Sequence, residues 1–199
     1  MAGVKQFDQS EVLDRAVILF WRRGYEATSI GDLVEAIGIN RGSLYATFGD
    51  KRRFFLASLQ RYIQTIGAAL FAELEANDPR HALEGMFAAI IERTSDSQFP
   101  RGCLVTNTSL ECPYSGDEIS RKVAELLAAQ ESAIYQVLRR AQAKGSLDSK
   151  QDARALARLF LAVAQGMNVA HKAGAAPAVL RDMAKTAMSI WKHPTAPKV

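Results

Sequence analysis

The sequence predicts an all-α protein, and three observations carry that prediction. Apolar residues recur at the three- and four-residue spacing of amphipathic helices along almost the whole chain, and no segment alternates for long as a β-strand does. Glycines, prolines and helix-capping residues separate the periodic segments. The 199 residues are 48% hydrophobic and 23% charged, which is typical of a globular chain. We expect an N-terminal unit of three short helices, followed by a larger helical domain.

Three short helices are expected in the first 48 residues. Gly24 and Gly38 end the first and the second, because glycine readily adopts the conformations that close helices. Thr28 or Ser29 caps the second helix, and Asn40 caps the third by accepting a hydrogen bond from a free backbone N–H group. The tight turn at Gly38 gives this segment the layout of a helix-turn-helix. The expected helices cover residues 9–23, 30–37 and 41–48.

Longer helices follow along the chain. Asp50 caps one that runs to about Ala76, and Pro79 breaks the chain after it. An irregular loop, SDSQFPRG, and a turn, CPYSGD, flank a short helix, and Gly145 ends the long helix that comes next. The expected helices cover residues 51–76, 80–94, 103–111, 117–144, 149–173 and 176–192.

Positive charge is concentrated around the third helix. The whole chain has a formal charge of +4, which is mild, but residues 39–62 contain five cations and a single acid, Asp50. On a helical wheel Leu44 and Phe48 point toward the core, while the opposite arc is small and polar except for Tyr45. Gly42 inside a helix costs about 1 kcal/mol relative to alanine, which indicates that another molecule approaches the backbone there.

These features predict contact with DNA, although a charge run such as KRR also fits a solvated helix face. Arg41 reaches a guanine edge or a phosphate, and Tyr45 suits a phosphate, a sugar or a thymine methyl group. Lys51 lies in the first turn of the following helix, where the free N–H groups add positive potential for a phosphate. The predicted DNA contacts are Thr28, Ser29, Arg41, Gly42, Ser43, Tyr45, Ala46, Thr47 and Lys51.

The segment VLDRAVILFWRRGYEATSIGDLVEAIGINRGSLYATFGDKRRFF resembles the DNA-binding domain of the TetR family of bacterial transcriptional regulators. Val34 stands where the family usually has alanine, and Asn40 replaces a serine that caps equally well. Because Arg41, Ala46 and Thr47 lie where family members vary, the operator sequence does not transfer. The family patterns match at Gly24-Tyr25, Thr28-Ser29-Ile30, Gly38–Tyr45 and Phe48–Lys51.

The resemblance implies a DNA-binding domain over residues 5–65, with the helix-turn-helix at 29–48, and an effector-binding and dimerisation domain over 66–199. The partners would be a double-stranded DNA operator, a second copy of the chain and an unidentified small-molecule effector. Repression is the family default. Two recognition helices about 34–36 Å apart would require a near-palindromic operator.

The last two helices are the expected dimer surface. The segment 153–170 is apolar around most of its circumference, and the final helix carries an apolar stripe. We expect the two helices to form a four-helix bundle with their two-fold copies. The alternative is that they complete the core of a monomer. The stripe consists of Val179, Met183, Ala187 and Ile190.

An effector pocket is expected in the C-terminal domain, among residues that would otherwise be ordinary core. Asn107 and Tyr114 would supply hydrogen bonds to the ligand. The helix after Asp50 would act as a lever, since Lys51 lies at one end and the Ile66-Leu70-Phe71 side at the other. The candidate ligand contacts are Phe87, Ile91, Cys103, Leu104, Asn107, Tyr135, Phe160 and Met167, and Leu110 belongs to the same group.

Cys103 supports an alternative, a thiol-based repressor that senses oxidants or electrophiles. It begins a helix just after Arg101, a setting that favours the reactive thiolate, and some TetR-family members with a similar GCL sequence sense reactive species. The competing interpretation is a small buried hydrophobe. Cys112 is nine residues away, ~13 Å along a helix, so we expect no disulfide between them.

Other classes find less support in the sequence. A helical enzyme would need converging catalytic residues, whereas acids such as Glu111 lie at positions typical of solvated helix faces. A nonspecific nucleoid protein would carry more charge. Three scattered histidines predict neither metal nor cofactor. We expect a cytoplasmic protein without a membrane span, because MAGVKQFDQSEV lacks the apolar run of a secretion signal and the segment 153–170 contains four polar residues.

Overall fold

The computed structural model describes residues 7–112 and 115–194. Within these residues the chain consists of α-helices joined by loops, with one π-helical turn and no strand, so the predicted all-α class is confirmed. Residues 5–6, Tyr114 and residues 195–199, which belong to the domains or contacts predicted above, lie outside the described residues.

The first three helices, which we call the head, have the predicted bounds. Ser29 and Asp32 form a capping box at the start of the second helix, and the Asn40 side chain accepts a hydrogen bond from the Ser43 N–H group at 2.8 Å. Gly38 between them has φ of 80°, a left-handed conformation that favours glycine. The helices are α1 (Gln9–Arg23), α2 (Ile30–Ile37) and α3 (Arg41–Phe48).

The lever that follows the head differs from the single helix expected over residues 51–76. Its middle part is a π-helical turn, η1 (Ile63–Gly67), between α4 (Lys51–Tyr62) and α5 (Ala68–Glu73). The sequence pattern does not reveal such a turn, because the apolar spacing of Tyr62, Ile66 and Leu70 also fits a continuous α-helix. Single π turns inside helices are frequent at functional sites.

Five helices form the rest of the part of the chain that the structure describes, which we call the body. Two of them are shorter than expected: Asp152 caps the fourth by accepting hydrogen bonds from the Arg154 and Ala155 N–H groups, and the fifth ends at Met188. The helices are α6 (Pro79–Arg93), α7 (Leu104–Glu111), α8 (Glu118–Ala143), α9 (Ala153–Lys172) and α10 (Pro177–Met188).

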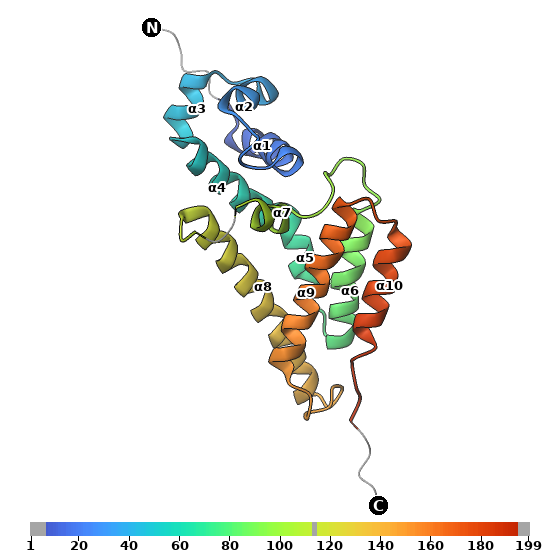
Figure 1. Cartoon of the computed structure of the whole chain (residues 1–199). Helices are drawn as coiled ribbons and strands as arrows, with labels where there is room; N and C mark the ends of the chain where they lie inside the picture. Colours follow the sequence, from blue (N-terminus) through green and yellow to red (C-terminus); the bar gives the residue numbers. More distant parts are fainter. Residues whose placement is uncertain (1–6, 113–114, 195–199) are drawn as a thin grey trace, which may run out of the picture.

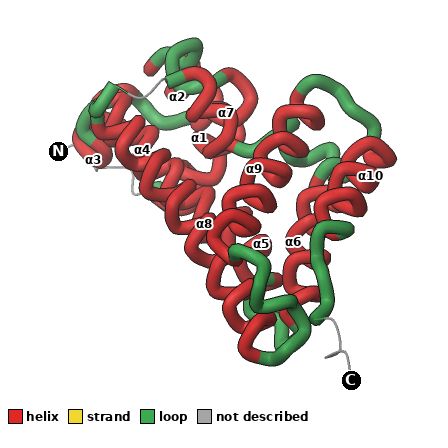
Figure 2. The backbone as a smooth tube through the Cα atoms, turned by 60° about the horizontal axis from the view of Figure 1, so that its bottom comes forward, coloured by secondary structure: helices red, strands yellow, loops and turns green. Residues whose placement is uncertain are grey.

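The head and the body lie at opposite ends of an elongated molecule (Figure 1). The lever runs from one to the other, and α6, α9 and α10 lie side by side in the body. The short helix α7 contacts α1 and α4 on one side and α8 and α9 on the other, and Figure 2 shows it next to the head. It therefore joins the two regions.

Two hydrophobic cores hold these elements together. The body core surrounds Phe87 and Phe160, whose ring centroids lie 6.1 Å apart. The head core surrounds Phe20, which contacts the rings of Phe54 and Phe55 edge-on. Residues far along the chain complete the head core, so the head does not pack by itself. They are Cys103, Leu104, Val105, Ile119 and Val123.

Candidate nucleic-acid interface

Helix α3 presents the polar face that its sequence predicts. Leu44 is fully buried, and the half-buried ring of Phe48 lies 4.4 Å from the ring of Phe54, centroid to centroid. The opposite side of α3 is open, and Tyr45 is 45% exposed at its centre. We call this side the reading face. It consists of Arg41, Gly42, Ser43, Tyr45, Ala46 and Thr47, of which Ser43 is half-buried and the others are exposed.

Gly42 leaves the start of the reading face bare. Within the described residues, a Cβ atom at this position would meet only the Asn40 carboxamide oxygen, at 3.3 Å. The fold of the chain therefore does not require a glycine here. A second molecule that approaches the backbone of α3 would require one.

Lys51 lies beside the reading face but is not free. Its amine is 3.4 Å from the Glu26 carbonyl oxygen and 4.4 Å from the centroid of the Tyr25 ring. An ammonium group has three donors, so donors remain for a phosphate. Asp50 caps the same helix by accepting a hydrogen bond from the Arg53 N–H group at 2.8 Å, and this bond lowers the pKa of its carboxyl.

The prediction for the side chain of Thr28 needs correction. Thr28 is fully buried, and its hydroxyl donates to the Gly24 carbonyl oxygen at 2.6 Å, so the side chain does not reach the surface. Ser29 is exposed, but its hydroxyl is engaged with Asp32 in the capping box. Hydrogen bonds from Ser29, followed by the one from Arg23, lower the pKa of Asp32 to about 2.

The sequence suggests that Glu111 lies on a solvated helix face, and the structure corrects this. Its carboxylate, at the end of α7, accepts hydrogen bonds from the Tyr25 N–H group at 2.9 Å and from the Glu26 N–H group at 2.6 Å. These groups belong to the turn between α1 and α2. The carboxylate occupies the space where a side chain at Gly24 would lie, and Gly24 has φ of 90°. Body and head are thus joined by charge-assisted hydrogen bonds.

At its other end, α7 borders a small cavity, which we call the inner cavity. Its volume is about 30 Å³, and it lies where the lever meets α6, α7, α8 and α9. Cys103 caps α7 at this point, and its sulfur accepts a hydrogen bond from the buried Tyr62 hydroxyl at 3.3 Å. Burial, with Cys103 as the next cause, raises the pKa of Tyr62 well above its usual range. The polar lining is Tyr62, Arg93, Cys103, Thr106, Gln130, Gln165 and Asn168.

Arg93 separates the inner cavity from an open cleft of about 550 Å³ between the lever and α6, which we call the outer cleft. Its guanidinium donates to the Asn168 carboxamide oxygen at 2.9 Å and lies 5.8 Å from the centroid of the Trp21 ring. Ile63 and Gly67, at the two ends of the π turn, also line the inner cavity. Movement of the Arg93 side chain would connect the two spaces.

Two family models match the chain. The model described as "Bacterial regulatory proteins, tetR family" matches residues 12–58, and "Tetracyclin repressor-like, C-terminal domain" matches residues 79–188. The chain belongs to the TetR family. The resemblance at the helix-turn-helix is thereby confirmed, and the family is that of DNA-binding transcriptional regulators.

Other TetR-family proteins align over most of the chain. The transcriptional repressor ComR of Escherichia coli (strain K12) is 37% identical over 190 residues, which are 94% of this chain and 90% of ComR. YezE of Bacillus subtilis (strain 168) is 34% identical over 160 residues, which are 79% of this chain and 82% of YezE. A structure of a cysteine mutant of the TetR-family regulator CifR, in complex with a 26-base-pair operator DNA, has a TM-score of 0.88 at 29% identity and covers 96% of this chain and 100% of its own.

The TetR-type body distributes the predicted ligand contacts over several places. Cys103 lines the inner cavity, Phe87 and Ile91 line a groove between α6 and α10, and the half-buried Tyr135 ring lies 3.8 Å beneath Arg154. Asn107 is buried, and its side-chain oxygen has no hydrogen-bond partner among the described residues. Leu110 is 65% exposed. The fully packed members of the set are Leu104, Phe160 and Met167.

Several polar residues of the inner cavity were not predicted. Gln165 and Asn168 stood out in the sequence as polar positions of an apolar helix, and their three-residue spacing places both on one face of α9. Tyr62 and Arg93 gave no such signal, because each fits the ordinary pattern of its own helix. Of the predicted lever residues, Ile66 and Phe71 are half-buried, and the side chain of Leu70 lies outside the described residues.

One part of the outer surface of the last two helices is apolar. On α9 a stripe of small and aliphatic residues faces away from the core, with Leu159 39% and Val169 40% exposed. It adjoins the predicted stripe on α10, since a Cβ at Gly166 would lie 3.5 Å from the Met183 methyl group. In that stripe Val179 is 47% exposed and Met183 and Ile190 are half-buried, whereas Ala187 is buried in the body core. No helix of residues 7–112 and 115–194 is long and apolar enough to cross a membrane.

Proposed function

We propose that this TetR-family chain is a ligand-responsive repressor that binds a near-palindromic operator as a homodimer and leaves it when a small-molecule effector binds. The DNA-binding domain would comprise residues 5–65, and the effector-binding and dimerisation domain residues 66–199. The observation that carries the proposal is the reading face of α3, which is open and polar beside fully buried Leu44.

Some residues of the reading face would recognise DNA bases, and others would contact the DNA backbone. Arg41 has no ion pair within the described residues, so its guanidinium is available for two hydrogen bonds to a guanine. Tyr45 and Lys51 would hold the helix in register on sugar and phosphate groups. Gly42 would let the backbone of α3 approach the groove. Exposed Ala46 and Thr47 would contact base edges or thymine methyl groups.

A second copy of the chain is the partner that fits the apolar stripes on α9 and α10. Contiguous apolar surface of this kind is unfavourable in water, and a two-fold axis through it would bury the stripes of both copies. The four helices would form a bundle, with one head at each side. A dimer also supplies the two recognition helices that a palindromic operator requires.

An effector would act through the inner cavity. The cavity is too small for a ligand as it stands, so binding requires the Arg93 side chain to move and the lever and α7 to separate. Because Cys103 and Glu111 lie at opposite ends of α7, displacement at the cavity is transmitted to the turn at Tyr25. A ligand that binds the displaced arrangement more tightly weakens DNA binding by the same factor.

The second candidate is the thiol sensor, and the position of Cys103 in the inner cavity supports it. With hydrogen peroxide, the thiol would become a sulfenic acid while the peroxide is reduced to water. The added oxygen would displace the Tyr62 hydroxyl from the sulfur. Peroxide should then release the wild-type protein and Cys112→Ser from DNA, but not Cys103→Ser. Equal release of all three would exclude this candidate.

The main proposal is tested by selecting bound fragments from a random DNA pool and measuring the mass of the protein free and bound. We expect a near-palindromic site occupied by two chains. The affinity for this site should remain much higher than the affinity for bulk DNA when salt is raised. Recovery of fragments without a common sequence, or of one chain per site, would contradict the proposal.

A further inference from the structure

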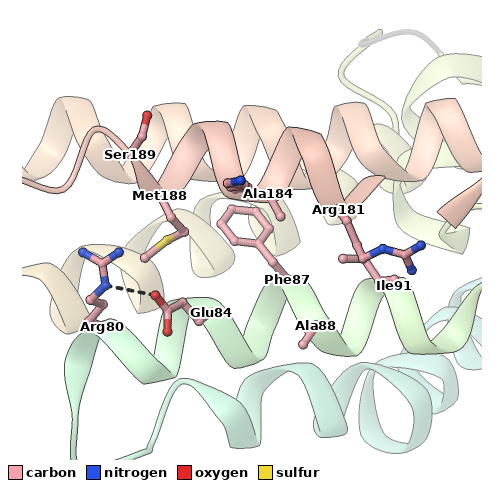
Figure 3. A pocket seen from close by; sticks show the side chains of 10 residues that line it. Arg80, Glu84, Phe87, Ala88, Ile91, Arg181, Ala184, Met188 and Ser189 are labelled. Carbon is pink, nitrogen blue, oxygen red and sulfur yellow. Dashed lines mark hydrogen bonds and ion pairs between the residues drawn. The ribbon is translucent and has the colours of Figure 1, made fainter. Parts of the chain in front are cut away.

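A groove between α6 and α10 lies on the outside of the body, away from the inner cavity. Its volume is about 480 Å³, and none of its lining residues lines the inner cavity. Figure 3 shows Phe87, Ala184 and Met188 along its middle, with Arg80 and Glu84 at one end and Arg181 near the other. The groove is therefore a separate space with an apolar floor and charged ends.

The charges of the groove favour an anion at one end. Glu84 is already paired with Arg80, whose guanidinium nitrogen lies 2.9 Å from the carboxylate. Arg181 and Lys185 take part in no side-chain hydrogen bond or ion pair within the described residues. Both are exposed. Two cations that form no ion pair within the described residues, next to an apolar floor, suit a ligand that has an apolar body and a negative end.

The groove stays open when the proposed dimer forms. At 100° per residue, Val179 and Met183 lie on one side of α10, whereas Arg181, Lys185 and Met188 lie on the other. The apolar stripe and the groove therefore use opposite faces of the same helix. Along α10 the groove runs from Arg181 to Ser189, a rise of ~12 Å.

We propose that this groove binds a small amphipathic anion, a medium-length apolar chain that ends in a carboxylate. The carboxylate lies between Arg181 and Lys185, and the chain extends over Phe87 toward Met188. Burial of the chain against these side chains supplies most of the affinity, and the two cations select an acid over an alcohol of the same length. The site is additional to the effector cavity proposed above, and its occupation does not depend on DNA binding.

Methionine methyl groups report on the two spaces separately. Met188 lines the groove, Met86 lies in a small cavity that adjoins the inner cavity, and Met183 lies on the opposite face of α10. With 13C-methyl methionine in the full chain, titration with decanoate should shift the Met188 signal first. Met188→Leu assigns that signal. Decanol at the same concentration should produce less than about one tenth of the occupancy, because it lacks the charged hydrogen bonds.

Three variants decide whether the groove is the site. Lys185→Glu and Arg181→Glu should each weaken decanoate binding about tenfold, and Ala88→Phe, at an exposed position of the groove, should block it. Lys150→Glu changes the charge equally at an exposed position outside the groove and should bind as the wild type does. A Met86 shift without a Met188 shift, no shift at millimolar decanoate, equal binding of decanol, or equal weakening by Lys150→Glu would each overturn the proposal.

Discussion

The caps at the starts of α2 and α3 in the head act on backbone groups close to them in the sequence, whereas several polar contacts inside the body join distant residues. Ser29 and Asn40 each accept from an N–H group three residues away. In the body, Arg93 reaches Asn168 and the Gly102 N–H group donates to His171 at 3.1 Å, across 75 and 69 residues. A local contact survives small shifts between helices. A distant contact changes with them.

This difference assigns separate tasks to the two regions. The caps of the head fix the ends of α2 and α3 through local contacts, which suits helices that present a face to DNA. The body has an inner cavity closed by a side chain, Arg93, that a ligand would displace. Glu111 connects the body to the head, because its hydrogen-bond partners in the turn at Tyr25 lie 85 and 86 residues away.

The largest expected effects test whether the two cores are separate at all. Phe20→Ala in the head core and Phe160→Ala in the body core should each lower the free energy of unfolding by about 3–5 kcal/mol. Because Leu104 and Val123 of the body complete the head core, both variants should unfold in one transition. Circular dichroism during urea unfolding measures this. Two resolved transitions would show that the head folds independently.

Glu111→Ala should have the next largest effect. It leaves two backbone N–H groups without their charged acceptor, and we expect a loss of about 1.5–3 kcal/mol in the free energy of unfolding. Glu118→Ala is the matched control. Glu118 bridges the body and the lever, but its pair with Arg52 of α4 is long, at 3.4 Å, and half exposed, so it contributes little. Equal losses would mean that Glu111 does not join the regions as described.

Arg41→Ala tests the head as a reader without touching the fold. For each Arg41 in the complex we expect the free energy of binding to the selected operator fragment to weaken by about 1–3 kcal/mol. The urea midpoint should not change, since Arg41 is exposed. Arg139→Ala, at an exposed position of α8, should bind DNA as the wild type does. Discrimination against base changes within the site should also weaken, and a variant that loses affinity without losing discrimination would place Arg41 on a phosphate.

The smallest effect concerns a distant contact of the body. Burial, then Arg101 and Arg93, lower the pKa of His171 below its usual 6.5, and its Nδ1 accepts from Gly102. The His171 side chain therefore binds a proton more readily in the unfolded chain than in the folded one. The contribution of His171 to the free energy of unfolding is complete above about pH 6.5 and falls as the pH drops below that value. Urea midpoints between pH 5 and 8, roughly the range of histidine titration, should show this slope.

The slope should persist in His81→Gln, because His81 is exposed, and should become shallower in His171→Gln. An unchanged slope in His171→Gln would assign the pH dependence to other groups.

Much of the head could be predicted from its sequence, because the contacts that end its helices are local. The caps at Ser29 and Asn40 and the turn at Gly38 act within a few residues, so their spacing is visible in the chain. Thr28 was misplaced because two adjacent hydroxyl residues fit one cap, and only packing shows which is inside. In the body, the helices were predicted but their neighbours were not. Phe87 and Cys103 therefore shared one expected pocket, although they line different spaces.

The sequence by itself determined the helical class, the ends of the first three helices and the open face of α3, because these depend on periodicity and on hydrogen bonds between near neighbours. The tertiary structure decided that Glu111 holds the head, that Tyr62 and Cys103 meet, and that the groove beside Arg181 is open. These features depend on how helices separated by tens of residues pack against one another. Hydrophobic burial drives that packing but is non-directional, so a hydrophobic pattern alone does not specify the partners.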